Sequence, residues 1–163
     1  MKHFLILAIA LFSSPLSAQE FTVPKDLQLE TAADYLAQND NIVAAVIWLR
    51  DTHLNKEQQK RKRVNTYLLQ WLTGTPTMTI TLGPGLADYG DCSDCLMLYM
   101  GGYAKAIIES GDDEPLATNL AAVRTVMDFY QNNKGRIGKN KVLQKFLKME
   151  GKGKLEAEVT KRM

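Results

Sequence analysis

The sequence predicts a mainly α-helical protein, a compact bundle of five to six helices with one short extended or β segment near residues 77–82. Three observations support this fold class. Apolar residues recur at helical spacing along most of the chain, and residues that begin or end helices stand beside these stretches. Only "TMTITL", residues 77–82, alternates polar and apolar residues without exception, which is typical of a strand.

The first eighteen residues are expected to be a secretory signal peptide. Lys2 precedes an apolar run from Phe4 to Phe12, and small residues lead up to Ala18, the expected cleavage site. The run is much shorter than the roughly 18 residues that a membrane-spanning helix needs, and no later segment reaches that length. We therefore expect an exported protein, periplasmic or secreted, with one helical domain over residues 19–150 and a basic tail over residues 151–163.

The first three helices are expected before the extended segment. Residues 26–38 form a loose amphipathic pattern, whereas "IVAAVIWLR", from Ile42, is apolar all round and should be buried. The third helix should begin near Asn55 with Gln58 in a capping box. Its polar half, "KEQQKRKR", precedes an apolar stripe that consists of Val64, Tyr67, Leu68, Trp71 and Leu72. Gly74, as the C′ residue, and Pro76 mark its end.

Three more helical patterns follow the extended segment. An apolar helix is expected over residues 93–109, and Pro115 suits the first position of the next one. A helix with outward lysines is expected over about residues 140–150. The final "LEAEVTKRM" should be a frayed helix or a disordered stretch. Ten Lys or Arg and three Asp or Glu lie between Lys134 and Met163, so the C-terminal part is basic.

The extended segment has one possible partner for a β ladder. "FTV", residues 21–23, is the only other short β-like stretch, and Pro24 would restrict it to a sheet edge. Either the two segments pair, or residues 77–82 keep an open edge to which a peptide could add as a strand.

Cys92 and Cys95 form a Cys-x-x-Cys motif at the predicted start of a helix. A local structural disulfide is favoured because export leads to an oxidising compartment. Free thiols and a redox function remain open, since a helix N-terminus stabilises a thiolate. The strand and helix alternation of a thioredoxin-like fold is missing, and Asp91 and Asp94 would oppose a thiolate.

Other site chemistry is scarce in the sequence. His53 is the one histidine after the signal peptide, which limits both a zinc site and a Ser-His-Asp constellation. No phosphate-binding glycine motif is present. We therefore predict no metal, no cofactor and no catalytic residue, and the sequence favours a protein that is not an enzyme.

Several residues are candidates for a binding face. Two tryptophans, the lone histidine and the basic helix start supply Trp48, His53, Lys56, Lys60, Arg63 and Trp71. Gly101 and Gly102 stand inside a helix, where each costs about 1 kcal/mol relative to Ala. They indicate either close approach of another helix or a ligand against exposed backbone. A protein, peptide or anionic envelope component is the expected partner, and no feature predicts nucleic acid.

Two stretches carry a resemblance. "AAVIWLRDTHLNKEQQKRKRVNTYLLQWLTGTPTMTITL" and "LMLYMGGYAKAI", within about residues 40–108, resemble small exported helical proteins of bacteria that have no assigned activity. The resemblance implies an exported helical domain and transfers no functional residues. Our functional hypothesis is a non-enzymatic binding protein of the cell envelope. The alternatives are a thiol–disulfide redox protein that uses Cys92 and Cys95, and a small-molecule carrier.

Overall fold

The computed structural model describes residues 20–83, 85–90 and 92–163, and these form seven helices and no strand. The helices are α1 (Ala32–Ala37), α2 (Asn39–Asp51), α3 (Gln58–Gly74), α4 (Ser93–Ser110), α5 (Pro115–Ile137), α6 (Lys141–Glu150) and α7 (Leu155–Thr160). The mainly helical class is confirmed. The predicted signal peptide, residues 1–18, lies outside the described residues.

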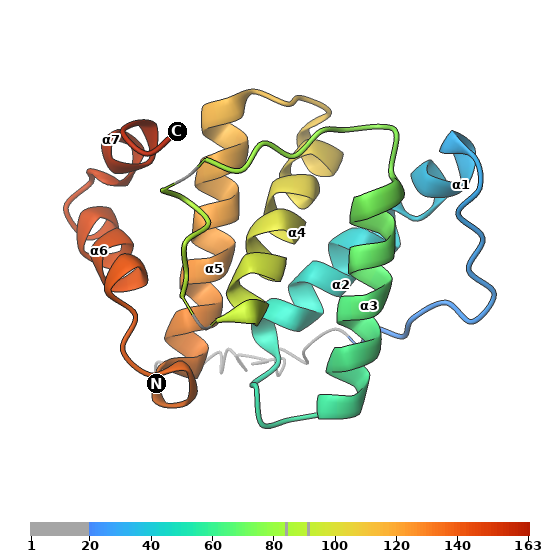
Figure 1. Ribbon diagram of the computed structural model, residues 1–163, viewed down its shortest axis with the longest axis horizontal. Coiled ribbons are helices and arrows are strands. Elements are labelled where there is room, and N and C mark those ends of the chain that lie inside the picture. Colours follow the sequence, from blue (N-terminus) through green and yellow to red (C-terminus); the bar gives the residue numbers. More distant parts are fainter. Residues whose placement is uncertain (1–19, 84, 91) are drawn as a thin grey trace, which may run out of the picture.

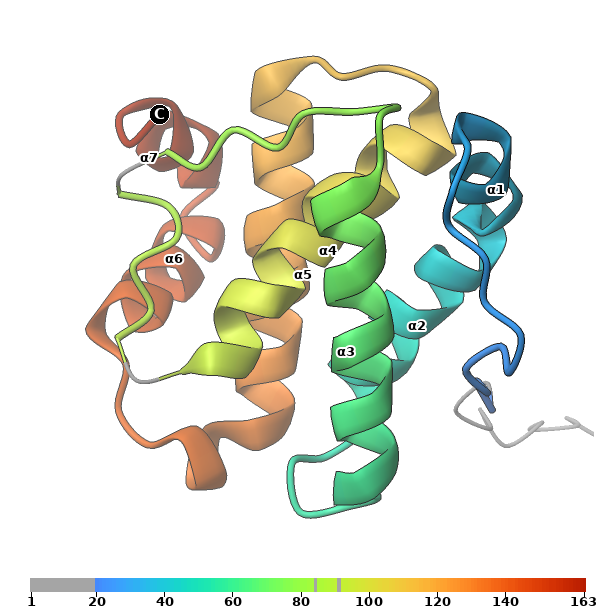
Figure 2. The same cartoon turned by 45° about the vertical axis from the view of Figure 1, so that its right-hand side comes forward.

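Helix α4 lies in the middle of the bundle and packs on α2, α3 and α5 (Figure 1). Helix α1 lies at one end of the molecule, and α6 and α7 lie together at the other. Figure 2 shows α2 crossing α3 and α4. The predicted apolar stripe of α3 faces this core, because Val64, Leu68 and Trp71 are fully buried. The indole Nε1 of Trp71 donates to the Tyr35 carbonyl at 3.0 Å, so its burial leaves no polar atom unpaired.

Residues 77–82 do not form the predicted strand. Met78 and Ile80 pack partly against the core as the alternation predicts, but no backbone–backbone hydrogen bond between described residues involves this segment. The other β-like stretch lies elsewhere, with the ring of Phe21 6.1 Å from that of Tyr67 in α3. A strand needs a ladder partner, so the segment stays irregular. Residues 77–82 therefore do not provide the strand edge that the hypothesis of strand addition requires.

Several helix boundaries differ from the expected ones. The first helix begins at Ala32 because Thr31 forms a capping box with Asp34. Helix α3 begins at Gln58 after Glu57, which has a left-handed backbone (φ 44°), and Asn55 does not cap it. Gly74 is the last helical residue rather than a left-handed cap. A Cβ at Gly74 would lie 2.0 Å from the Tyr35 hydroxyl oxygen, which explains the glycine.

The C-terminal residues form a folded helix. Leu155 and Val159 of α7 are buried, and the Glu158 carboxylate pairs with Lys145 Nζ at 2.7 Å and Arg162 Nε at 2.6 Å. Arg162 also donates from Nη1 to the Gly85 carbonyl at 2.8 Å. Residues 151–163, treated above as a tail, are thus part of the bundle. Of the two alternatives for the final residues, the helix is the one observed, and because a six-residue helix is too short to be stable alone, it depends on these tertiary contacts.

The two glycines inside α4 allow other helices to approach closely. A Cβ at Gly101 would lie 2.8 Å from Val46 Cγ2 of α2. One at Gly102 would lie 2.7 Å from Thr125 Oγ1 and 3.1 Å from the Ala122 Cα of α5. The helix-contact interpretation of this pair is therefore the one that the structure supports.

A Gly102→Ala variant should lose about 1–2 kcal/mol of unfolding free energy, although alanine is the better helix former. The added methyl group meets backbone of α5, which cannot yield as a flexible side chain does. Gly135→Ala is the matched control: its Cβ meets nothing within 4 Å, so we expect a gain of up to about 1 kcal/mol. Urea unfolding of both variants tests this, and equal effects of the same sign would contradict the packing argument.

Candidate functional site

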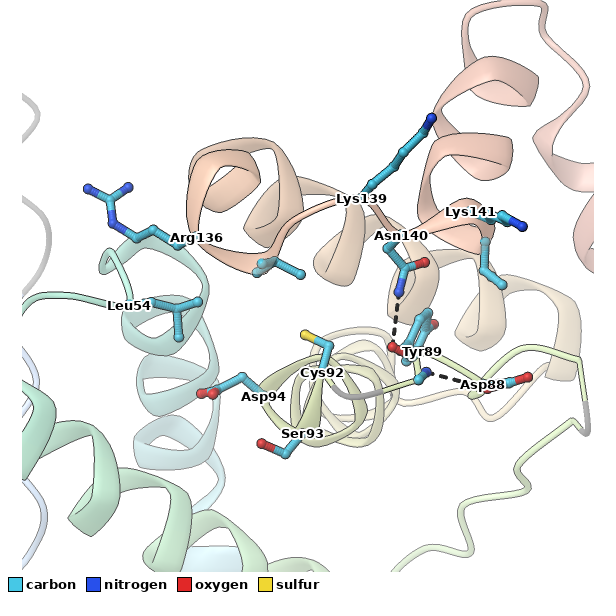
Figure 3. Close-up of a pocket in the computed structure, with 13 residues that line it drawn as sticks. Leu54, Asp88, Tyr89, Cys92, Ser93, Asp94, Arg136, Lys139, Asn140 and Lys141 are labelled. Atoms are coloured by element: carbon cyan, nitrogen blue, oxygen red, sulfur yellow. Dashed lines mark hydrogen bonds between the residues drawn. The ribbon is translucent and has the colours of Figure 1, made fainter.

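A cleft of about 530 Å³ lies between the start of α4 and the connection from α5 to α6 (Figure 3). Its lining includes Tyr89, Cys92, Ser93, Arg136, Lys139 and Lys141, and we call it the α4–α6 cleft. Residues far apart in the sequence form it, since the turn before α4 meets the start of α6. The cleft is in the volume range of small-ligand and peptide-side-chain sites.

Asn140 joins the two sides of the cleft. Its Nδ2 donates to the Tyr89 carbonyl at 2.9 Å, as Figure 3 shows, and its Oδ1 accepts from Leu143 N as the N-cap of α6. The Tyr130 hydroxyl donates to the Gly138 carbonyl at 3.1 Å and accepts from Asn140 N at 3.3 Å. The connection is therefore fixed against both α5 and the 88–90 turn.

Cys92 and Cys95 are joined in a disulfide, so the expectation of a disulfide is confirmed and the free-thiol alternative is wrong. The two sulfurs differ in surroundings. Cys92 is the N-cap of α4, is half-buried and lines the cleft, whereas Cys95 is 0% exposed in the core. In Figure 3 the Cys92 sulfur lies among the lining side chains. Only one end of the disulfide is accessible from the cleft.

The charges around the cleft are predominantly positive. Arg136, Lys139 and Lys141 are exposed along one side, and the ion pairs between described residues include none of the three. Asp88 lies on the other side. The carboxylate of Asp94 is 3.2 Å from Arg61 Nη1, which offsets its charge.

Arg61 joins α2 to α4 beside the α4–α6 cleft. Its Nη1 donates to the Leu49 carbonyl at 3.3 Å as well as to Asp94, and Nη2 donates to the carbonyls of Leu49 and Thr52. One guanidinium thus binds the carbonyl end of α2 and the first turn of α4. Burial lowers the pKa of Arg61, and the nearby Asp94 partly opposes this shift. Arginine is so strongly basic that the group stays charged despite this shift.

The predicted binding face is not brought together. Trp48 is buried, with Lys60 Nζ 4.7 Å from its ring centroid, and Trp71 is buried farther along α3. His53 and Lys56 are exposed in the connection between α2 and α3. His53 and Lys56 therefore lie on the surface, whereas both tryptophans lie in the core.

Lys60 and Arg63 line a separate pocket of about 500 Å³ between α3 and the N-terminal segment. Lys25 lines the same pocket, and the carboxylates of Glu20 and Glu57 offset part of the charge of these three cations. Lys60 Nζ lies 3.5 Å from a Glu57 carboxylate oxygen. Three cations and two carboxylates line each of the two cavities, but in the α4–α6 cleft one carboxylate, Asp94, is paired with Arg61, which does not line the cleft.

Gly101 and Gly102 are buried between helices, and their backbone faces neighbouring side chains rather than an open cavity. The neighbouring side chains therefore leave no space for a ligand against this backbone.

The three cations of the cleft are absent from the residues that the sequence singles out. The run "GRIGKNK" contains them, and the basic C-terminal part is a visible signal. The run "GRIGKNK" lies near the cysteine pair because of the Asn140–Tyr89 hydrogen bond, which joins residues 51 positions apart in the sequence.

The described part of the chain has neither a cluster of metal ligands nor a helix that could span a membrane. No group of three His, Cys, Asp or Glu side chains is placed to hold a metal ion. Every helix of these residues is too short or too polar to cross a bilayer. No family model, curated protein or solved structure matches this chain, so the resemblance to exported bacterial helical proteins stays a prediction.

Proposed function

We propose that this protein is an exported, non-enzymatic binding protein of the cell envelope, and that its α4–α6 cleft holds an acidic peptide segment of a partner protein. The supporting observation is the set of three cations, Arg136, Lys139 and Lys141, along one cleft. Clustered positive charge attracts and orients an anionic partner, and it acts most strongly where side chains are partly shielded from water.

A peptide suits the cleft better than a bare anion does. Leu54, Ile137 and Val142 line the same cavity and are half-buried, so apolar side chains of a partner would find contacts beside the cations. Binding sites combine apolar contact area with a few placed polar groups in this way. The partner segment should therefore carry Glu or Asp next to Leu, Ile or Val.

Export is supported by two independent features. The start of the sequence has the layout of a secretory signal peptide, and a disulfide forms and persists in oxidising compartments. Both favour a protein that works outside the cytoplasm.

The binding proposal is tested with a fluorescent peptide that alternates Glu with Leu and contains no cysteine. Replacing Arg136, Lys139 and Lys141 together by Gln should weaken binding about tenfold or more, since exposed charge pairs contribute up to about 1 kcal/mol each. Fluorescence anisotropy at two salt concentrations measures the effect, and higher salt should weaken wild-type binding.

The matched control replaces Lys148, Lys152 and Lys154 by Gln, which changes the net charge equally on exposed side chains outside the cleft. This variant should bind nearly as the wild type does. An equal loss in the control would show attraction by overall charge only. A loss caused by Lys60→Gln with Arg63→Gln would place the site at α3. Either result, or absence of wild-type binding, contradicts the proposal.

A further inference from the structure

We propose that the Cys92–Cys95 disulfide undergoes thiol–disulfide exchange, through Cys92, with a cysteine-containing partner whose thiol enters the α4–α6 cleft. This activity goes beyond the binding function proposed above and does not depend on it. A small thiol needs only access to the sulfur, whereas peptide binding needs the whole cleft.

The first argument is the difference in access to the two sulfurs. Cys92 lines the α4–α6 cleft and also a neighbouring pocket of about 380 Å³ formed with Ala87 and Leu96. Cys95 is fully buried. An attacking thiolate can therefore reach Cys92 Sγ, while Cys95 becomes the leaving group inside the protein.

The second argument concerns the charge that Cys92 would carry after the disulfide opens. Cys92 is the N-cap of the 18-residue helix α4, and its own side chain makes no capping hydrogen bond with the described residues. Helix N-termini stabilise a thiolate, so the start of α4 favours one at Cys92. The sequence-based objection to a thiolate weakens for Asp94, whose carboxylate pairs with Arg61 and also accepts from Asn65 at 3.4 Å.

The third argument is that the fold does not depend on this bond. The disulfide joins residues three apart, so it closes a very small loop and constrains the unfolded chain little. Other contacts hold the start of α4 in place. Among them are Arg61 with Asp94, Asn140 with the Tyr89 carbonyl, and Cys95 N with the Cys92 carbonyl at 3.0 Å. The bond can therefore open without loss of the bundle.

The exchange is balanced as follows. A partner thiolate attacks Cys92 Sγ, a mixed disulfide forms, the Cys92–Cys95 bond breaks, and Cys95 leaves as a thiolate that takes the proton released by the partner thiol. A second partner thiolate then attacks the partner sulfur of the mixed disulfide and releases the Cys92 thiolate. The partner is oxidised to a disulfide and this protein is reduced to the dithiol. The reverse sequence, with a disulfide-bearing partner, reoxidises the pair.

The test uses glutathione as the probe and single-cysteine variants of the whole exported chain. Cys95→Ser leaves Cys92 alone, and oxidised glutathione should convert it to a stable mixed disulfide seen by intact mass. Cys92→Ser leaves the buried Cys95, which should react at least tenfold more slowly. Equal rates, or no reaction of Cys95→Ser, would overturn the proposal. Circular dichroism and thermal unfolding establish that both variants are folded. The rate of the glutathione reaction is measured below the temperature at which unfolding begins, so that it reports on the folded state.

A second measurement addresses the wild-type pair and its charges. Reduced glutathione should convert a measurable fraction of the wild-type disulfide to the dithiol, and a pair that stays fully oxidised would contradict the inference. In Cys95→Ser, iodoacetamide alkylation should give a Cys92 pKa below the ordinary value of about 8.5. An unshifted pKa would also contradict it.

The two proposals fail in different experiments. The peptide assay uses the oxidised protein and a ligand without cysteine, so it reports only on binding. The glutathione assay uses a thiol too small to need the full cleft, so it reports only on exchange.

Discussion

An Arg61→Met variant is expected to lose about 3 kcal/mol or more of unfolding free energy, the range seen when one partner of a buried ion pair is removed. The guanidinium is 5% exposed and binds the carbonyls of Leu49 and Thr52 besides the Asp94 carboxylate. Methionine fills similar volume but offers no donor. The buried carbonyls would then lose their partner, which carries a penalty beyond that of the lost hydrogen bonds. Urea unfolding monitored by tryptophan fluorescence measures the effect.

Two controls make this prediction specific to the guanidinium. Lys62→Met changes the adjacent, exposed side chain by the same chemistry and should alter stability by less than about 0.5 kcal/mol. Arg61→Lys keeps the charge, but a lysine lacks the planar guanidinium that reaches two carbonyls and a carboxylate at once. This variant should therefore also lower the free energy of unfolding. A loss below about 1 kcal/mol in Arg61→Met would mean that water replaces the guanidinium.

Replacing Leu155 and Val159 together by alanine should cost about 4 kcal/mol and release α7 from the bundle. Burial of each such side chain contributes roughly 1.5–3 kcal/mol, and α7 packs on α5 and α6 through these residues. The amides of α7 should then exchange with deuterium much faster. Glu156→Ala, an exposed change in the same helix, should leave exchange and stability almost unaltered.

The docking of α7 should also depend on pH. Lys145 and Arg162 lower the pKa of Glu158 by donating to its carboxylate, so the folded state binds this proton less readily than the unfolded chain does. The contribution of Glu158 to stability is therefore present above the ordinary carboxylate pKa and is lost as the pH falls through the lowered folded-state value. As the pH is lowered, the free energy of unfolding should fall more steeply in the wild type than in Glu158→Gln. Identical pH profiles would contradict this role of Glu158.

The interior of the bundle was largely predictable from local patterns. Four members of the predicted stripe are buried and the fifth, Leu72, is half-buried against the core, while Pro115 begins α5 as expected; the buried four are Val64, Tyr67, Leu68 and Trp71. The glycines of α4 meet neighbouring helices, which was one of the two alternatives. Such features are visible in the sequence because each depends on helical periodicity or on the backbone chemistry of a single residue.

The candidate site was only half predictable. Cys92 and Cys95 stand out in the sequence, but their unequal exposure and the cations opposite them arise from contacts between distant segments. Of the residues predicted for a binding face, Trp48 and Trp71 are buried, whereas His53 is exposed. An aromatic residue in a helical stripe is more often core than surface, and position in the stripe alone does not reveal what covers it.

By itself, the sequence determined the helical class and the nature of the core, since these follow from periodicity, and it favoured a disulfide between Cys92 and Cys95 without deciding it. The tertiary structure decided the rest. It alone left residues 77–82 without a strand partner, docked the helix of residues 155–160 on the bundle, and brought Arg136, Lys139 and Lys141 into the lining of the cleft that Cys92 also lines. The physical reason is that a ladder, a short docked helix and a charged cleft each need a partner from elsewhere in the chain, and no local pattern encodes which partner arrives.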